Sequence, residues 1–195
     1  MLDLKLSLVG SLVAFVSVAG CAVQPAENLG DTGDETAVGS SEEGLTVACG
    51  LSRAKILASA TGGRLTAIER GFAWYDAHVS YSQSRYHEGY RTDCSGFVSM
   101  CWQLGTSFTT ADFIDGSGDD ALLPSYSSLL PGDALVHRSG GSGHVVLFLG
   151  WSDTAQSAAC VLEEESTALD MQFHARTTSS LHSGGYHAIR ADKLR

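Results

Sequence analysis

The chain has 195 residues, which suits one domain with appendages. It is acidic, with 22 Asp and Glu against 12 Lys and Arg and a formal net charge of −10. Six of the acids and none of the bases lie in residues 22–48, so the rest of the chain is nearer to neutral. This balance gives no sign of the basic face that nucleic-acid binding normally needs, and we expect no nucleic-acid partner.

Residues 1–20 have the pattern of an export signal. Lys5 supplies a positive charge, and the apolar run from Leu6 to Val18 is too short for an ordinary membrane span. The run ends in Val18-Ala19-Gly20-Cys21, which resembles the signal of bacterial lipoproteins. In those proteins the peptide is cut before the cysteine, so Cys21 is the expected site of lipid attachment. The lipid would anchor the protein on the outer face of a membrane of the cell envelope; the alternative is an ordinary signal peptide with a cysteine nearby.

Residues 21–48 are predicted to be a flexible, acidic tether. They are rich in Gly, Ser, Glu, Asp and Thr and contain no aromatic residue, so they cannot bury enough apolar surface to offset the entropy of ordering. The folded domain is expected to span residues 49–195.

The first part of that domain shows helical spacing of apolar residues. The pattern predicts a helix over residues 53–60 and a second through residues 65–75, with a break or kink at Gly62-Gly63. A polar, aromatic loop is expected over residues 79–90, and residues 106–128 look irregular.

Cys94 stands where this loop becomes a short helix, predicted over Ser95 to Leu104 and closed by Gly105. Exposed backbone N–H groups and the positive end of the helix dipole favour a thiolate over a thiol at such a position. Cys94 is therefore a candidate nucleophile; the alternative is a buried structural cysteine.

From Leu129 onward the pattern changes to short strands. They are expected over residues 134–137, 144–150 and 159–164, with a closing strand around 186–190. Helices first and antiparallel strands afterwards predict an α+β fold in which the Cys94 helix packs on a small sheet.

His144 begins an apolar strand directly after the Gly-rich loop 140–143, where its imidazole could be exposed at the end of the sheet. A neutral imidazole near a thiol can take the thiol proton, and a third polar group normally orients the ring. Glu163, Glu164 and Glu165 would lie beside His144 in an antiparallel hairpin. One of them could orient the ring, or all three could form a solvated strand end. The other six histidines are expected in loops or on the surface.

With Cys21 assigned to lipid and Cys94 to chemistry, three of the five cysteines remain: Cys49, Cys101 and Cys160. An exported protein can form disulfides, so one bridge is possible, but the sequence does not decide which pair forms. Cys101 follows Cys94 by seven residues, on roughly the same helix face, and is expected in the core. No Cys or His spacing indicates a zinc site.

Three segments together resemble the NlpC-type family of bacterial cell-wall peptidases, papain-like thiol hydrolases related to the CHAP amidases. They are Asp93-Cys94-Ser95-Gly96-Phe97-Val98, Leu130-Pro131-Gly132-Asp133 and Gly143-His144-Val145-Val146-Leu147-Phe148-Leu149-Gly150. The match covers roughly residues 53–166. The resemblance implies a papain-like α+β fold, Cys94 as nucleophile, His144 as base and a third polar residue on the following strand.

In many family members the third residue is a His inside a short apolar-His-Ala motif, which is absent here. A Glu at that place resembles a subset of the family. We choose Glu164, with Glu163 as the alternative, because the two point to opposite faces of a strand and alternation does not decide between them.

The resemblance also implies residues that contact the substrate. Tyr81 matches by position a family tyrosine whose hydroxyl lines the site, although Ser82-Gln83-Ser84 replaces the usual Trp-Gly-Gly. Asp93 and Ser95 flank the nucleophile as in members that bind the free amine of a stem peptide. Asp93 could equally be an ordinary acid at a helix N-terminus.

The expected function is hydrolysis of an amide bond in a peptidoglycan stem peptide, as a D,L-endopeptidase that uses Cys94 and His144 and needs no metal or organic cofactor. Two alternatives remain open. The same fold could act as an amidase, acyltransferase or transglutaminase on another amide, or the chain could be a non-catalytic, envelope-binding lipoprotein.

Overall fold

The computed structural model describes residues 47–116 and 119–195. The predicted signal peptide, Cys21 and the tether as far as residue 46 lie outside the described residues. The first described residue, Val47, already pairs with the sheet: it exchanges backbone hydrogen bonds of 3.3 and 2.7 Å with Ala175. Within the described part of the chain, no helix has the length and apolar character needed to cross a membrane.

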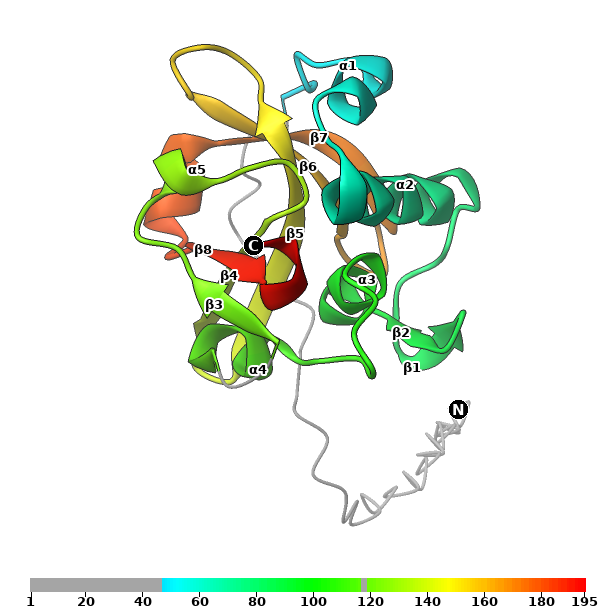
Figure 1. Ribbon diagram of the computed structural model, residues 1–195. Coiled ribbons are helices and arrows are strands. Elements are labelled where there is room, and N and C mark those ends of the chain that lie inside the picture. The colour runs from blue at the N-terminus through cyan, green and yellow to red at the C-terminus, as the bar shows by residue number, and fades with distance from the viewer. Residues whose placement is uncertain (1–46, 117–118) are drawn as a thin grey trace, which may run out of the picture. The chain divides into compact units, whose positions relative to one another are not determined.

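The described chain is an α+β fold, as predicted (Figure 1). Its helices are α1 (Arg53–Ala58), α2 (Gly62–Asp76), α3 (Cys94–Cys101), α4 (Thr110–Asp115) and α5 (Thr178–Ser183), with 3-10 turns at Tyr126–Ser128 and Asp192–Leu194. The strands are β1 (Ser82–His87), β2 (Tyr90–Thr92), β3 (Asp120–Leu122), β4 (Ala134–Ser139), β5 (Ser142–Trp151), β6 (Ala158–Glu164), β7 (Met171–Thr177) and β8 (His187–Ala191).

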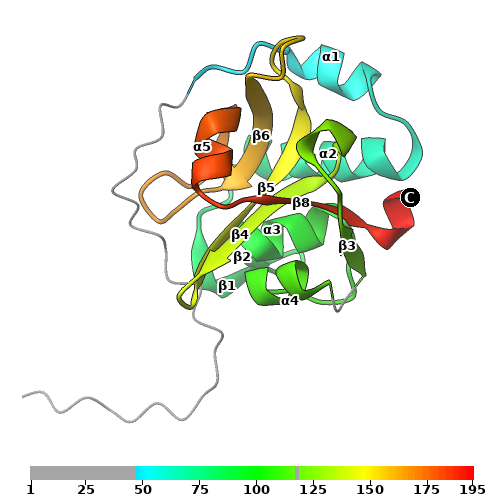
Figure 2. The same ribbon diagram turned by 90° about the vertical axis from the view of Figure 1, so that its left-hand side faces the viewer.

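Six of these strands form one antiparallel sheet in the order β3-β8-β4-β5-β6-β7. Helices α2 and α3 pack on one face, where they bury a core that includes Val145, Leu147 and Leu149 of β5. The other face carries a second core that includes Val146 and Phe148, together with a leucine of α5. Figures 1 and 2 show the sheet between α3 and α5.

Alternation along β5 therefore determines which core each residue enters, and the same rule applies to the polar residues at its start.

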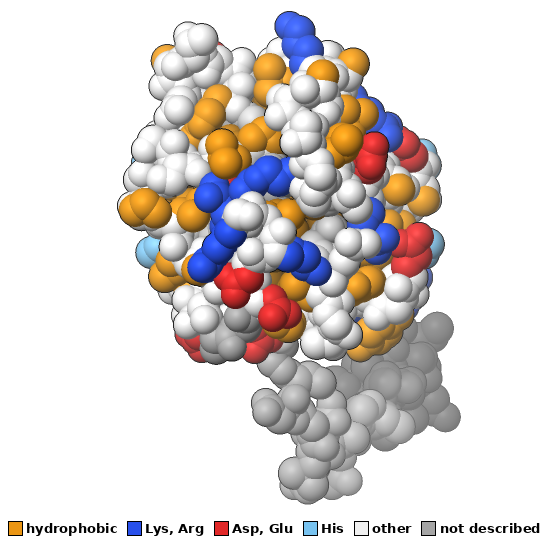
Figure 3. Space-filling view, in the orientation of Figure 1, with side chains coloured by type: hydrophobic (Ala, Val, Ile, Leu, Met, Phe, Trp, Pro, Cys, Tyr) orange, Lys and Arg blue, Asp and Glu red, His pale blue; other side chains and the backbone are white. Residues whose placement is uncertain are grey.

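On the face seen in Figure 3, Lys and Arg side chains gather near the middle and Asp and Glu side chains lie below them and to one side. That face carries both signs of charge.

The first two helices occur as predicted, but the break precedes Gly62, which begins α2. The predicted loop over residues 79–90 is wrong, because β1 and β2 form a two-stranded hairpin there. Helix α3 ends at Cys101, before the predicted end at Leu104, since Gln103 takes a left-handed conformation (φ 50°) and the helix closes before reaching Gly105.

Strand β7 and helix α5 were not predicted, and α4 and β3 form within residues 106–128, which the sequence pattern indicated as irregular. In β7 the polar residues Gln172, His174 and Arg176 alternate with apolar ones. This period of two was the available signal for a strand.

Asp133, the last residue of the Leu-Pro-Gly-Asp segment, is a buried hub of the fold. Its carboxylate accepts hydrogen bonds from Arg64 (2.9 Å) and from two nitrogens of Arg190 (2.9 and 2.7 Å), and also from the backbone N–H of Leu130 (2.8 Å). The turn is thereby tied to α2 and β8. A buried charge held by two guanidinium groups fixes the geometry of this corner.

The structure decides the pairing of the cysteines. Cys49, just before α1, forms a disulfide with Cys160 on β6, with 5.1 Å between the Cα atoms. Cys101 lies in the core, as expected, and burial raises the pKa of its thiol. The bridge joins residues 111 positions apart, which a sequence cannot reveal.

Reduction of this disulfide should lower the free energy of unfolding by about 2–5 kcal/mol, because it frees a long loop in the unfolded chain. Urea denaturation with and without dithiothreitol measures the change. A Cys49→Ser, Cys160→Ser double variant is the control and should not respond to dithiothreitol. Equal midpoints for the oxidised and reduced wild type would contradict the prediction.

Candidate functional site

Cys94 is the first residue of α3, and the local sequence explains why the helix begins there. Asp93 is the N-cap residue: its side chain accepts a hydrogen bond of 2.7 Å from the backbone N–H of Gly96. A Cβ atom at position 96 would lie 1.9 Å from the carbonyl oxygen of Arg91, so only glycine fits. The strand that precedes α3 thus passes directly against its first turn.

The two residues that flank Cys94 are buried and help to hold this helix start. The guanidinium group of Arg91 forms an ion pair with Asp93 and donates to Ser95 Oγ at 2.8 Å and to the carbonyl oxygen of Phe108 at 3.0 Å. Ser95 Oγ in turn donates to Asp93 at 3.3 Å. Of the two roles considered for Asp93, these contacts describe the helix cap; amine binding by Asp93 and Ser95 stays a prediction.

The Cys94 side chain is 1% exposed and belongs to the core on the α3 side of the sheet. Tyr81, the predicted lining residue, is also buried, and its backbone N–H donates to the carboxylate of Asp170 at 2.8 Å. This bond fixes the chain just before β1. A role for the Tyr81 hydroxyl stays a prediction.

His144 lies on β5 and is hydrogen-bonded to Glu163 on β6. The distance from His144 Nε2 to Glu163 Oε2 is 2.5 Å, and the glutamate is fully buried. Both side chains lie on the face of the sheet that carries Val146 and Phe148. Because Nε2 faces the carboxylate, Nδ1 is the ring nitrogen that can accept a proton from a thiol.

The structure corrects the choice between the two glutamates: Glu163, and not Glu164, contacts His144. Glu164 points to the opposite face of β6 and is fully buried, and among the described residues neither of its carboxylate oxygens has a hydrogen-bond partner. Burial raises the pKa of Glu164 to about 9, and the neighbouring acids Asp170 and Asp93 add to the effect. At neutral pH this side chain is an uncharged acid.

In the part of the chain that the structure describes, Glu163 has two further partners, both on β7. His174 Nε2 lies 2.5 Å from Glu163 Oε1, and Arg176 donates from Nε and Nη2 to the two carboxylate oxygens, each at 2.7 Å. Burial alone would raise the pKa of Glu163, but Arg176 and the two histidines outweigh it and hold this pKa well below its usual range. The expectation that His174 lies in a loop or on the surface is wrong.

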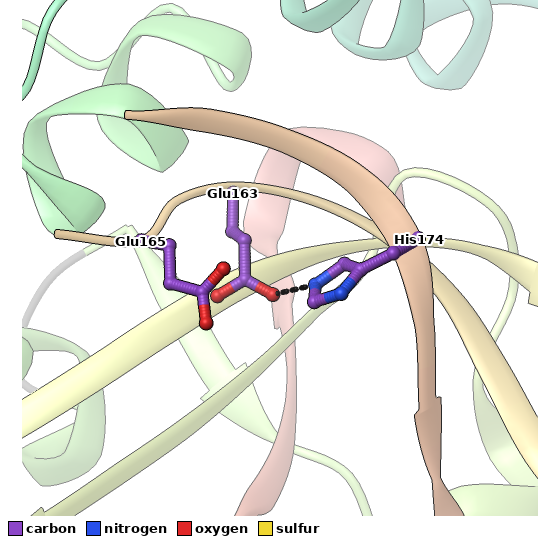
Figure 4. Close-up of side chains that lie close together, drawn as sticks. All are labelled: Glu163, Glu165 and His174. Atoms are coloured by element: carbon purple, nitrogen blue, oxygen red, sulfur yellow. Dashed lines mark hydrogen bonds and ion pairs between the residues drawn. The ribbon is translucent and has the colours of Figure 1, made fainter. Parts of the chain in front are cut away.

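Glu165 completes this group of polar residues (Figure 4). Ligand atoms of Glu163, Glu165 and His174 lie within 4.8 Å of one another, a spacing that could hold a metal ion. Arg176, however, already pairs with Glu163 at 2.7 Å and with Glu165 at 3.4 Å. A metal ion there would have to compete with the guanidinium group, so the cluster fits an ion-pair network better than a metal centre.

Tyr186, which the sequence analysis did not single out, lies near this network. Its ring centroid is 4.5 Å from that of His137, the residue directly opposite His144 on β4. Burial raises the pKa of the Tyr186 hydroxyl; Arg176 opposes the shift, while Glu163 and Cys94 reinforce it. The Tyr186 hydroxyl is therefore within electrostatic range of both Cys94 and Glu163. The sequence around Tyr186 indicated a closing strand but gave no sign that this residue lies near the Glu163 network.

A Gly96→Ala variant should lose the packing of α3, because the added methyl group overlaps the Arg91 carbonyl. We expect destabilisation by about 3 kcal/mol or more, or failure to fold. Gly105→Ala is the matched control, since among the described residues no atom beyond the adjacent positions in the chain lies within 4 Å of the Cβ it would add. Thermal unfolding followed by circular dichroism compares the two. Equal melting temperatures would contradict the overlap.

A Glu164→Gln variant should change the pH dependence of stability. Between the ordinary pKa of 4.5 and the folded value of about 9, the folded chain keeps a proton on Glu164 that the unfolded chain releases. The free energy of unfolding of the wild type should therefore fall as the pH rises through this range.

The Gln variant lacks this loss and should be more stable than the wild type at pH 8 by roughly 1–3 kcal/mol, with a smaller difference at pH 5. Denaturant unfolding at both pH values tests this. A stability difference between the two proteins that does not vary with pH would show that Glu164 is ionised in the fold.

Comparisons with known proteins identify no family for the chain. No protein-family model, no curated protein and no solved structure matches it.

Proposed function

We propose that the chain is a thiol hydrolase that cleaves an amide bond in a peptidoglycan stem peptide, with Cys94 as nucleophile, His144 as general base and Glu163 as the residue that orients His144. The observation that carries the proposal is the buried hydrogen bond of 2.5 Å between His144 Nε2 and Glu163. A buried, ionised carboxylate can only accept hydrogen bonds, so it holds the imidazole with the proton on Nε2 and leaves Nδ1 as the base.

The proposed reaction is acyl transfer to Cys94. His144 Nδ1 takes the thiol proton, the sulfur attacks the amide carbon, and the protonated imidazole then donates its proton to the leaving amine. Water, activated by the same imidazole, releases the acyl group from the sulfur. Backbone N–H groups at the start of α3 would stabilise the oxyanion, a contribution of about 3 kcal/mol per donor in other hydrolases.

The substrate class is proposed from the sequence. The three segments that resemble the NlpC-type family are those around Cys94, Asp133 and His144, and papain-like architecture is part of the proposal. The predicted lipoprotein signal would place the domain in the cell envelope. The disulfide between Cys49 and Cys160 suits the oxidising conditions met by exported proteins.

One observation favours a second candidate, a non-catalytic envelope lipoprotein. Cys94 is only 1% exposed and belongs to the α3-side core, as a structural cysteine would. A catalytic Cys94 must meet the imidazole at the end of the sheet. The reactivity of the thiol separates the two candidates.

Purified peptidoglycan should release new peptide amines when incubated with the wild-type protein, and mass spectrometry of the fragments should name the bond. Cys94→Ser should abolish release. Glu163→Gln should lower the rate by about 10²–10⁴-fold, because it removes the orienting carboxylate. Glu164→Gln, the adjacent residue on the opposite face, is the control and should keep most of the activity. Equal losses in the two Gln variants would argue against the assigned role of Glu163.

Alkylation of Cys94 by iodoacetamide tests the nucleophile without any substrate. If His144 ionises the thiol, the wild type should react readily at pH 6 and His144→Ala should react much more slowly at that pH. Peptide mapping distinguishes Cys94 from the buried Cys101. A wild-type Cys94 thiol that does not react would support the non-catalytic candidate. If Cys94 alkylates rapidly but neither the wild type nor Cys94→Ser releases peptide from peptidoglycan, the thiol is a nucleophile and its substrate is another amide.

A further inference from the structure

We propose that Arg176 and His174 are positioning residues of this site: from β7 they hold the Glu163 carboxylate as a fixed hydrogen-bond acceptor, which keeps His144 in the tautomer that presents Nδ1 as base. The inference rests on the proposed function for its catalytic consequence. Its structural content, the tautomer of His144, can be measured separately.

Arg176 fixes both the orientation and the charge of the Glu163 carboxylate. Its Nε and Nη2 atoms contact the two oxygens of Glu163 at 2.7 Å each, which is the two-pronged arrangement that only a guanidinium group offers. The two bonds fix the plane of the carboxylate and compensate its charge in a fully buried position. Without a cation there, a buried carboxylate would tend to take up a proton.

A protonated Glu163 would have an O–H to donate, and its partner could then be the imidazole nitrogen instead of its N–H. The tautomer of His144 would no longer be determined, and Nδ1 would carry the proton in part of the molecules. In this proposal Arg176 acts on the reacting thiol through Glu163 and His144, without touching the thiol itself.

His174 holds the same carboxylate from a second side. It is 7% exposed and its Nε2 lies 2.5 Å from the Glu163 oxygen that does not contact His144. The carboxylate is thus held between two imidazole rings, one from β5 and one from β7. His174 and Arg176 are two positions apart on the same strand, so alternation directs both side chains to the same face.

Other titratable groups lie near Glu163, His144 or Arg176 and contribute to any pH profile. They are Glu165 after β6, His137 on β4, and Tyr186 before β8, with Cys94 acting on Tyr186 from α3. Burial, His144 and Arg176 lower the pKa of His137 to about 4, so His137 stays neutral at the pH values used below. Burial and Glu163 raise the pKa of Glu165, the group with which a profile in the acidic range could be confused.

The test is nitrogen-15 NMR of the histidine side chains in the full chain. In the wild type at pH 8, both His144 and His174 should show the Nε2–H tautomer, with Nε2–H protons shifted far downfield. In Arg176→Gln, the nitrogen shifts of His144 should move toward a mixture of tautomers, and Arg176→Lys, which restores charge but not the two-pronged contact, should lie between. An unchanged His144 tautomer in Arg176→Gln would overturn the proposal.

His174→Gln is the second variant, because it leaves the ion pair of Arg176 intact should Arg176→Gln not fold. It should loosen Glu163 and lower kcat for peptide release at least threefold with little change in KM, and it should shift the pH profile of Cys94 alkylation. Controls are Arg53→Gln, which removes an exposed guanidinium paired with Asp76, and His78→Asn at an exposed position with φ 49°.

The outcomes separate the two proposals. A tautomer change in Arg176→Gln with no peptide release by the wild type would keep the positioning network and reject the proposed substrate. Suppose instead that the wild type releases peptide, and that the His144 tautomer, the alkylation profile and kcat are unaltered in the Arg176 and His174 variants. That result would support the proposed hydrolase and reject the positioning role of Arg176 and His174.

Discussion

The candidate site depends on one buried negative charge, the carboxylate of Glu163. Removing a carboxylate from water is costly unless cations and hydrogen bonds replace the solvent, and here Arg176 and two histidines do so. Because these partners come from β5 and β7, the charge ties β5, β6 and β7 together at the end of the sheet where His144 lies. The same contacts that make the charge tolerable also determine which imidazole nitrogen can act as a base.

Glu163 and Glu164 show how strongly environment outweighs residue type. They are adjacent on β6 and both are fully buried, yet the pKa of Glu163 is held well below its usual range while that of Glu164 is raised to about 9. The pleat of the strand sends one toward Arg176 and the other toward Asp93 and Asp170, so one meets a cation and the other meets acids. One side chain is suited to orient a base, and the other is a neutral acid in the core.

The segments that suggested a family are largely structural in this fold. Gly96 lies against the Arg91 carbonyl, Asp133 binds Arg64 and Arg190, and a Cβ atom at Gly143 would lie 2.3 Å from Thr110 Oγ1. Such residues indicate how the chain packs more directly than which reaction it performs. The residues that bear on a reaction are fewer: Cys94, His144 and the side chains that contact them.

The sequence by itself determined the α+β class, the first two helices, the strands at 134–137, 144–150 and 159–164 and the position of Cys94 at a helix start, because local periodicity and capping residues are encoded nearby in the chain. Only the tertiary structure decided that Cys49 pairs with Cys160, that Glu163 rather than Glu164 contacts His144, and that His174 and Arg176 join them. These contacts join segments far apart in the chain or depend on strand register, and a shift of one residue would exchange the two faces of β6. No local pattern records that register.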